Sequence, residues 1–194
     1  VMTRARYFIF IPAIFRALER ESRSVRRNAE RYVEQRQKDL CRALMATDES
    51  QPGIIGKLRA GDVVIHPSRI YWSGLRELEI YQAGISEAAL LRHIAAAGTD
   101  GGMSDDDGIV HESDAASRWH PECPTDAVID NRTNEFTSKL SLELTVEEAE
   151  YLLQRMLHRE GNGPPSLLGH RLQALRSGEL SLDAWPWETT RLPA

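Results

Sequence analysis

The fold depends first on Thr3-Arg-Ala-Arg-Tyr-Phe-Ile-Phe-Ile-Pro-Ala-Ile-Phe-Arg16, the most apolar stretch of the 194-residue chain. Wound into a helix, residues 7–15 present apolar side chains on nearly every side, and such a helix is a buried one. The Arg-Ala-Leu-Glu-Arg sequence at residues 16–20 favours a helix over a strand. We therefore predict a core helix over residues 3–20, kinked or broken at Pro12, whose ring removes a backbone donor.

Charge is distributed unevenly along the chain. The whole chain carries a net charge of −5. Residues 1–42 hold eleven basic and five acidic side chains, a net +6, so the remainder carries −11. The two parts either attract each other or face different partners. The contents of 41% hydrophobic and 27% charged residues are close to the globular norm and exclude a wholly disordered or collagen-like chain.

The apolar run does not have the length of a membrane segment. A spanning helix needs about 20 apolar residues, whereas Arg16 ends this run at once. The small-residue cleavage site of a signal peptide does not follow it either. Cys41 and Cys123 are far apart and form no Cys-x-x-Cys pair, which is typical of reduced cytosolic cysteines. We expect a cytoplasmic protein with no membrane segment and no cofactor.

Further helices are predicted from capping residues and apolar spacing. Ser22 or Ser24 starts a long basic helix to about position 45, since apolar residues recur there at steps of three and four. Pro67 suits the first turn of a third helix, which extends to about position 81. Ser86 caps a fourth helix that ends near position 98.

The second half of the chain begins with a polar segment. Residues 98–138 are rich in Gly, Asp, Ser, Thr and Pro and show almost no apolar period, so we predict a long acidic surface loop. Thr145-Val-Glu-Glu148 is a capping box that starts a helix. Ser166 caps another, which predicts an antiparallel pair of helices followed by a tail that carries Trp185-Pro-Trp187.

Together these elements predict a mainly α fold, an irregular multi-helix bundle with a long acidic loop and at most a minor β element. We divide the chain into an N-terminal helical region with the basic second helix (residues 1–97), the acidic flexible loop (98–138), and the C-terminal helical hairpin with its tryptophan-rich tail (139–194). The length suits a single domain overall.

No intact catalytic motif is found. Gly53-Ile-Ile-Gly56-Lys57 resembles a phosphate-binding loop, but Gln51 and Leu58 stand where glycine and Ser or Thr are required. The acidic loop carries enough donors for a zinc or manganese site, although their spacing matches no closed tetrahedral pattern. These weak metal candidates, which would support a metal-assisted hydrolase, are Asp105, Asp107, His111, His120 and Cys123.

The basic N-terminal half is the best lead to function. Arginines clustered on one side of a helix can contact phosphates. Pairing with the acidic loop, or a solvated helix face, is the alternative interpretation. The candidate nucleic-acid-binding residues are Arg4, Arg6, Arg23, Arg26, Arg27 and Arg31.

Several motifs recur together in one family. They are Thr3-Arg-Ala-Arg-Tyr-Phe-Ile-Phe-Ile-Pro12, Ser68-Arg-Ile-Tyr-Trp-Ser-Gly-Leu75, Trp119-His-Pro121, Leu144-Thr-Val-Glu-Glu-Ala-Glu-Tyr-Leu152, Ser166-Leu-Leu168 and Trp185-Pro-Trp187. With them the chain resembles an uncharacterised bacterial family of unknown function. Members of that family carry a segment before the Arg-Tyr-Phe run, so the resemblance implies a copy truncated at the N-terminus. It also implies a bacterial cytoplasmic setting, in which some members are encoded near phage-defence genes.

We therefore expect a non-enzymatic helical interaction module, an accessory component of a bacterial defence assembly, whose partner is a protein or the missing N-terminal segment. Two alternatives remain open. One is a direct nucleic-acid-binding protein that uses the basic N-terminal helices, and the other is a metal-assisted hydrolase with ligands in residues 105–123.

Overall fold

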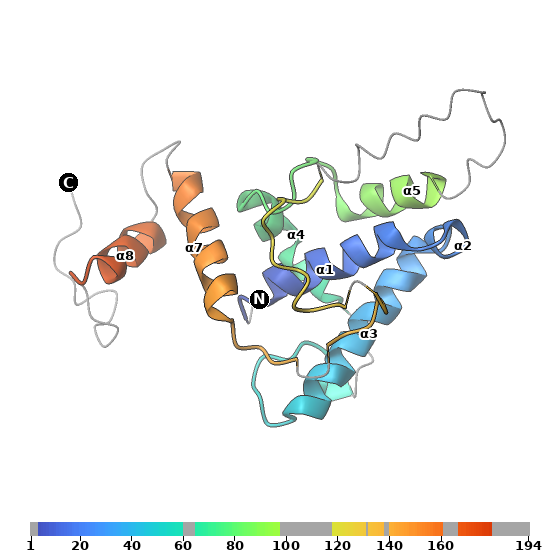
Figure 1. Cartoon of the computed structure of the whole chain (residues 1–194), viewed down its shortest axis with the longest axis horizontal. Helices are drawn as coiled ribbons and strands as arrows, with labels where there is room; N and C mark the ends of the chain where they lie inside the picture. The colour runs from blue at the N-terminus through green and yellow to red at the C-terminus, as the bar shows by residue number, and fades with distance from the viewer. Residues whose placement is uncertain are drawn as a thin grey trace. The chain divides into compact units, whose positions relative to one another are not determined.

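The protein is mainly helical in its computed structural model, as the sequence predicts (Figure 1). The structure describes residues 4–59, 65–97, 118–130, 132–137, 140–160 and 167–179. Within these ranges there is no sheet, and β pairing is limited to two isolated antiparallel bridges. The helices are α1 (Tyr7–Arg20), α2 (Arg23–Arg26), α3 (Ala29–Thr47), α4 (Pro67–Glu77), α5 (Glu87–Ala97), α7 (Val146–Glu160) and α8 (Leu167–Arg176), with a short 3-10 helix at Lys57–Arg59.

The chain divides into two compact units, Val1–Tyr151 and Leu152–Ala194. The second unit contains the end of α7 and all of α8. Residues 98–117, the first part of the predicted acidic loop, lie outside the described residues, as does the predicted tail at Trp185-Pro-Trp187. None of the described helices is long and apolar enough to cross a membrane.

Helix α1 is the core helix of the first unit, as predicted. Every residue from Tyr7 to Phe15 is buried, and α1 packs against α3 and α4 (Figure 1). The helix continues through Pro12 and does not break there. Burial of each large apolar side chain contributes about 1.5–3 kcal/mol, so the packing on both sides of Pro12 outweighs the loss of one backbone hydrogen bond.

The predicted second helix is divided into α2 and α3. The division lies at Arg27 and Asn28, and Asn28 has non-helical dihedral angles. Ser22 precedes α2, but its hydroxyl pairs with that of Ser24 at 2.9 Å and does not cap the helix. No residue of α2 is buried, whereas α3 buries one face from Ala29 onward. The core therefore fixes the direction of α3, whereas α2 contacts α1, α3 and α5 without burying a residue.

The predicted starts of α4 and α5 are confirmed. Pro67 occupies the first turn of α4, where its missing amide has no helical partner to lose. The Ser86 hydroxyl accepts a hydrogen bond from the Ala89 amide at 3.2 Å, which caps α5. The main-chain amide of Ser68 donates to the Gln37 side-chain oxygen at 2.8 Å and thereby ties α4 to α3.

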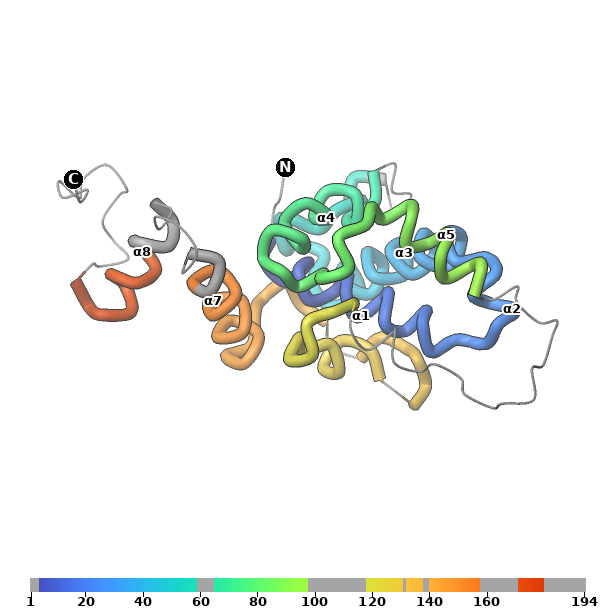
Figure 2. The backbone as a smooth tube through the Cα atoms, turned by 90° about the horizontal axis from the view of Figure 1, so that it is seen from above, coloured from blue at the N-terminus to red at the C-terminus, as the bar shows by residue number. Residues whose placement is uncertain are grey.

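Residues 118–137 differ from the surface loop that the sequence predicts across 98–138. The described part of this segment lies alongside α1 in both views (Figures 1 and 2) and buries Trp119, Val128 and Ile129. The Arg16 guanidinium holds it by donating to the His120 carbonyl at 2.8 Å and the Cys123 carbonyl at 3.2 Å. The spacing of apolar residues does not predict the burial of this segment. Because the segment is neither helix nor sheet, its buried positions follow no fixed spacing.

Trp119 enters an aromatic cluster that also contains Phe15, Trp72 and Tyr81. The ring of Trp119 lies 5.6 Å from that of Phe15 and 5.0 Å from that of Tyr81, measured between centroids. Backbone hydrogen bonds fix this position, since the Gln82 amide donates to the Arg118 carbonyl and the His120 amide donates to the Ile80 carbonyl, each at 2.8 Å. The aromatic cluster therefore joins α1, α4 and residues 118–120.

The capping box at the start of α7 is confirmed. The Thr145 amide donates to Oε2 of Glu148 at 2.8 Å, and the Glu148 amide donates to the Thr145 hydroxyl at 3.2 Å. The second carboxylate oxygen of Glu148 accepts from Nε and Nη2 of Arg6, at 3.1 and 2.9 Å. Both side chains are buried, with exposed fractions of 7% for Arg6 and 1% for Glu148. Glu148 is thus both a helix cap and one half of a buried ion pair.

Candidate functional site

The six candidate arginines do not form one face. Arg6 lies in the core, where its guanidinium also donates to the Ser141 carbonyl at 2.9 Å. Arg4 is exposed and donates from Nε to the Pro52 carbonyl at 3.1 Å. Arg6 is therefore not placed to contact a phosphate, and its burial corrects the prediction that it belongs to a surface patch.

The remaining four candidates form the arginine corner, which consists of Arg23, Arg26, Arg27 and Arg31 at α2 and the start of α3. Arg23, Arg27 and Arg31 are exposed, and Arg26 is half-buried. Within the described residues, neither Arg23 nor Arg31 forms an ion pair. The sequence does not determine whether these basic side chains face the core or the solvent. In the structure, three of the four are exposed to solvent.

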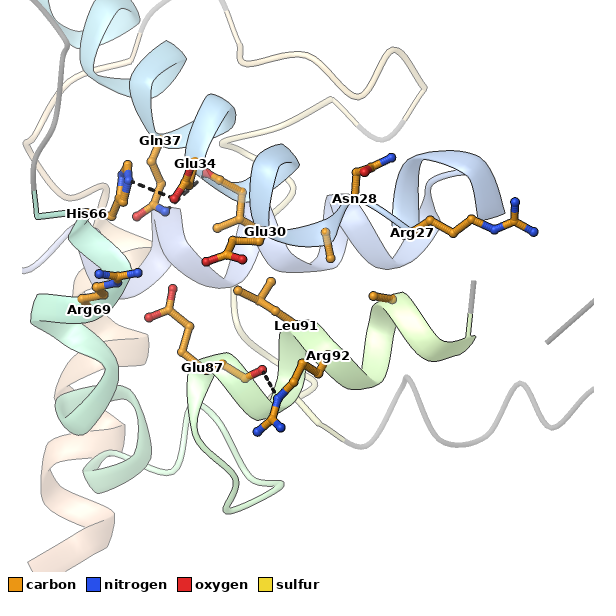
Figure 3. A pocket seen from close by; sticks show the side chains of 14 residues that line it. Arg27, Asn28, Glu30, Glu34, Gln37, His66, Arg69, Glu87, Leu91 and Arg92 are labelled. Carbon is orange, nitrogen blue, oxygen red and sulfur yellow. Dashed lines mark hydrogen bonds and ion pairs between the residues drawn. The ribbon is translucent and has the colours of Figure 1, made fainter. Parts of the chain in front are cut away.

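A pocket of about 320 Å³ lies where α3, α4 and α5 meet (Figure 3). Glu30 and Glu34 are one helical turn apart on α3 and so lie on the same face. Glu87, the first residue of α5, faces them from the other side, and the Ser68 hydroxyl donates to its Oε1 at 2.5 Å. We call this site the acidic pocket, defined by Glu30, Glu34 and Glu87.

His66 lines the acidic pocket beside Glu34. Its Nε2 lies 3.8 Å from Oε1 of Glu34, and its side chain is 10% exposed. Burial lowers the pKa of His66 below its ordinary value, and the nearby Glu34 carboxylate only partly opposes this shift. His66 is therefore neutral at pH 7 and does not neutralise the carboxylates.

Glu87 is shifted in the direction expected of a buried acid. Burial raises its pKa, and the negative charge of Glu30 raises it further. The Ser68 hydroxyl and the Arg69 guanidinium act in the opposite direction. The ionised form of Glu87 is thus not fully compensated by the protein itself.

The acidic pocket is hardly apparent from the amino-acid sequence. Glu30 and Glu34 are equally compatible with exposed pairs to neighbouring Arg31 and Lys38 on the same helix. Two like charges at positions i and i+4 of a helix repel each other. This repulsion between Glu30 and Glu34 is the local feature of the sequence that indicates the site. The arrival of Glu87 from α5 depends on tertiary packing.

The proposed metal ligands divide between described and undescribed residues. Asp105, Asp107 and His111 lie outside the described residues. Cys123 is buried, which raises the pKa of its thiol to about 12 and keeps it protonated. A zinc-binding cysteine is a thiolate. Among the residues that the structure describes, no group of three or more His, Cys, Asp or Glu side chains has the arrangement of a metal site.

Comparison with known proteins supplies no relative: no family model, no curated protein and no solved structure matches the chain. The function must therefore be argued from the arginine corner and the acidic pocket.

Proposed function

We propose that this protein is a non-enzymatic helical interaction module that binds an acidic protein partner through the arginine corner. The observation that carries the proposal is the outward orientation of Arg23, Arg27 and Arg31. Exposed guanidinium groups form bidentate hydrogen bonds with carboxylates, so an acidic surface on a partner is the complementary ligand. In keeping with the family that its motifs resemble, we place this module in the bacterial cytoplasm as an accessory component of a defence assembly.

The first test reverses the charge of the arginine corner. The triple variant Arg23→Glu, Arg27→Glu, Arg31→Glu is expected to lose at least about tenfold of the partner captured by the wild type, since each charged contact contributes about 1.5–3 kcal/mol. Capture from nuclease-treated bacterial extract, quantified by mass spectrometry, measures this loss. A matched control reverses three exposed arginines elsewhere, Arg42, Arg76 and Arg132, and has the same net charge. Equal capture by the two triple variants would contradict the proposal.

Direct binding of nucleic acid is a second candidate, favoured by the same exposed guanidiniums. Each phosphate contact on duplex DNA adds about −0.9 to the slope of log K against log salt concentration. The charge-reversed arginine corner is therefore expected to make that slope shallower by about 2–3, measured by fluorescence anisotropy with a labelled 20-base-pair duplex. The matched control triple should keep the wild-type slope. Undetectable binding at low salt would exclude this candidate.

The metal-assisted hydrolase receives no support from the described residues. The one thiol among the candidate ligands, that of Cys123, is buried and protonated. The carbonyl of Cys123 accepts a hydrogen bond from Arg16, which helps to hold residues 118–137 in place.

A further inference from the structure

The acidic pocket has the size of a site for a single side chain or a small ligand. Its volume of about 320 Å³ is near the lower end of the range for ligand pockets, which is about 300–1,000 Å³. Val33, Ala88 and Leu91 line part of the wall and offer apolar surface to a methylene chain. A ligand that fits here is short, with an aliphatic stem and a polar head.

The charge at the centre of the pocket determines whether the polar head of the ligand is positive or negative. Figure 3 shows the carboxylates of Glu30, Glu34 and Glu87 directed toward the middle of the pocket, whereas the guanidinium groups of Arg27 and Arg92 extend away from it. Arg92 donates instead to the Ala88 carbonyl at 3.3 Å. Three carboxylates against one nearby guanidinium, that of Arg69, leave a negative centre that repels anions and attracts a cation.

His66 does not supply a positive charge to the pocket. Its Nδ1 is buried and has no hydrogen-bond partner among the described residues. Because Nε2 is the nitrogen that faces Glu34, the neutral ring is best placed with its proton on Nε2, which leaves Nδ1 as an acceptor. The neutral ring therefore leaves the negative charge of the nearby Glu34 carboxylate in place, and a bound cation would supply the opposite charge.

We propose that the acidic pocket binds an organic cation, a guanidinium or primary ammonium group on an aliphatic stem. The head group would lie between Glu30 and Glu87, and the stem would lie along Val33 and Leu91. An arginine or lysine side chain of a partner and a free polyamine share this chemistry. The site shares Arg27 with the arginine corner, but its three carboxylates lie outside that corner, so the carboxylate variants test it separately from the function proposed above.

The test measures binding of two probes by isothermal titration calorimetry and NMR. N-acetyl-arginine amide represents a basic side chain, spermidine represents a polyamine, and inorganic phosphate is the anionic control. We expect one of the two cations to bind, with chemical-shift changes at α3 and α5, and phosphate not to bind there. The cation that binds more tightly identifies the source. Absence of binding by both cations, or binding of phosphate at the pocket, would overturn the proposal.

Substitution of Glu87 separates a binding role from a structural one. Glu87→Gln is expected to weaken cation binding by roughly tenfold, whereas Glu122→Gln, at an exposed position outside the pocket, should leave it unchanged. Because the folded state raises the pKa of Glu87, ionisation of this group at pH 7 opposes folding, so removing its charge should not lower the melting temperature. Wild-type affinity in Glu87→Gln and in Glu30→Gln would show that these carboxylates do not bind the cation.

The pH dependence has a defined sign. The groups that face Glu87 are Ser68 and Arg69 from α4 and Glu30 from α3. Since the cation needs the ionised carboxylate, affinity should fall as the pH is lowered through the raised pKa of Glu87, and Glu87→Gln should flatten that fall. An affinity that rises on acidification would contradict the assignment.

Discussion

Arg6→Met is expected to lower the free energy of unfolding by about 3–5 kcal/mol, because it leaves the buried Glu148 carboxylate without its partner. The loss also deprives the Ser141 carbonyl of a donor. Glu148 cannot move to solvent without breaking its hydrogen bond to the Thr145 amide, and that bond caps α7. Urea denaturation followed by far-ultraviolet circular dichroism measures the change.

Two further variants make this result specific. Arg6→Met combined with Glu148→Gln should recover part of the stability, since it removes the uncompensated charge. Arg42→Met breaks the exposed pair with Asp39, whose 2.9 Å contact lies in solvent, and should cost no more than about 1 kcal/mol. If Arg6→Met and Arg42→Met lowered stability equally, the buried Arg6–Glu148 ion pair would contribute no more to stability than an exposed pair.

Trp119→Ala is expected to lower the free energy of unfolding by about 3–5 kcal/mol, the usual cost of removing a buried tryptophan side chain. Trp119 is 1% exposed, and its ring contacts Phe15, Trp72 and Tyr81. The truncation would leave a cavity at the point where residues 118–120 pair with Ile80 and Gln82. Chemical denaturation monitored by circular dichroism gives the value without relying on tryptophan emission.

The control for Trp119 is Leu58→Ala, at a fully exposed apolar side chain, which should change stability by less than about 0.5 kcal/mol. Trp119→Phe should cost less than Trp119→Ala, because a phenyl ring retains part of the contact with the aromatic cluster. A loss below about 1 kcal/mol for Trp119→Ala would mean that residues 118–137 behave as the surface loop their composition suggests.

Local signals in the sequence identified most helices. The capping box of Thr145 and Glu148, the serine cap at Ser86 and the first-turn Pro67 each act within four residues, so their effect is independent of the rest of the fold. The interruption at Asn28 escaped prediction because the apolar spacing continues across it. Whether a helix is held straight there depends on what α2 packs against, and α2 buries no residue.

The candidate sites were less accessible to prediction than the helices. The arginine corner was anticipated as part of a larger set, from which the structure removes Arg6 by burying it. The acidic pocket was not anticipated. Its carboxylates come from two helices that are distant in sequence, and no spacing rule links Glu30 with Glu87.

The amino-acid sequence of this protein specifies its helical class, its central helix and its charge asymmetry, because periodicity, capping and net charge are properties of short or summed stretches of chain. Whether a charged side chain faces the core or the solvent is not such a property. Arg6 turns inward to Glu148 across 142 positions, while Arg23 and Arg31 stay in solvent. Which side chains are buried depends on how all of them pack into one core, and that packing exists only in the folded unit.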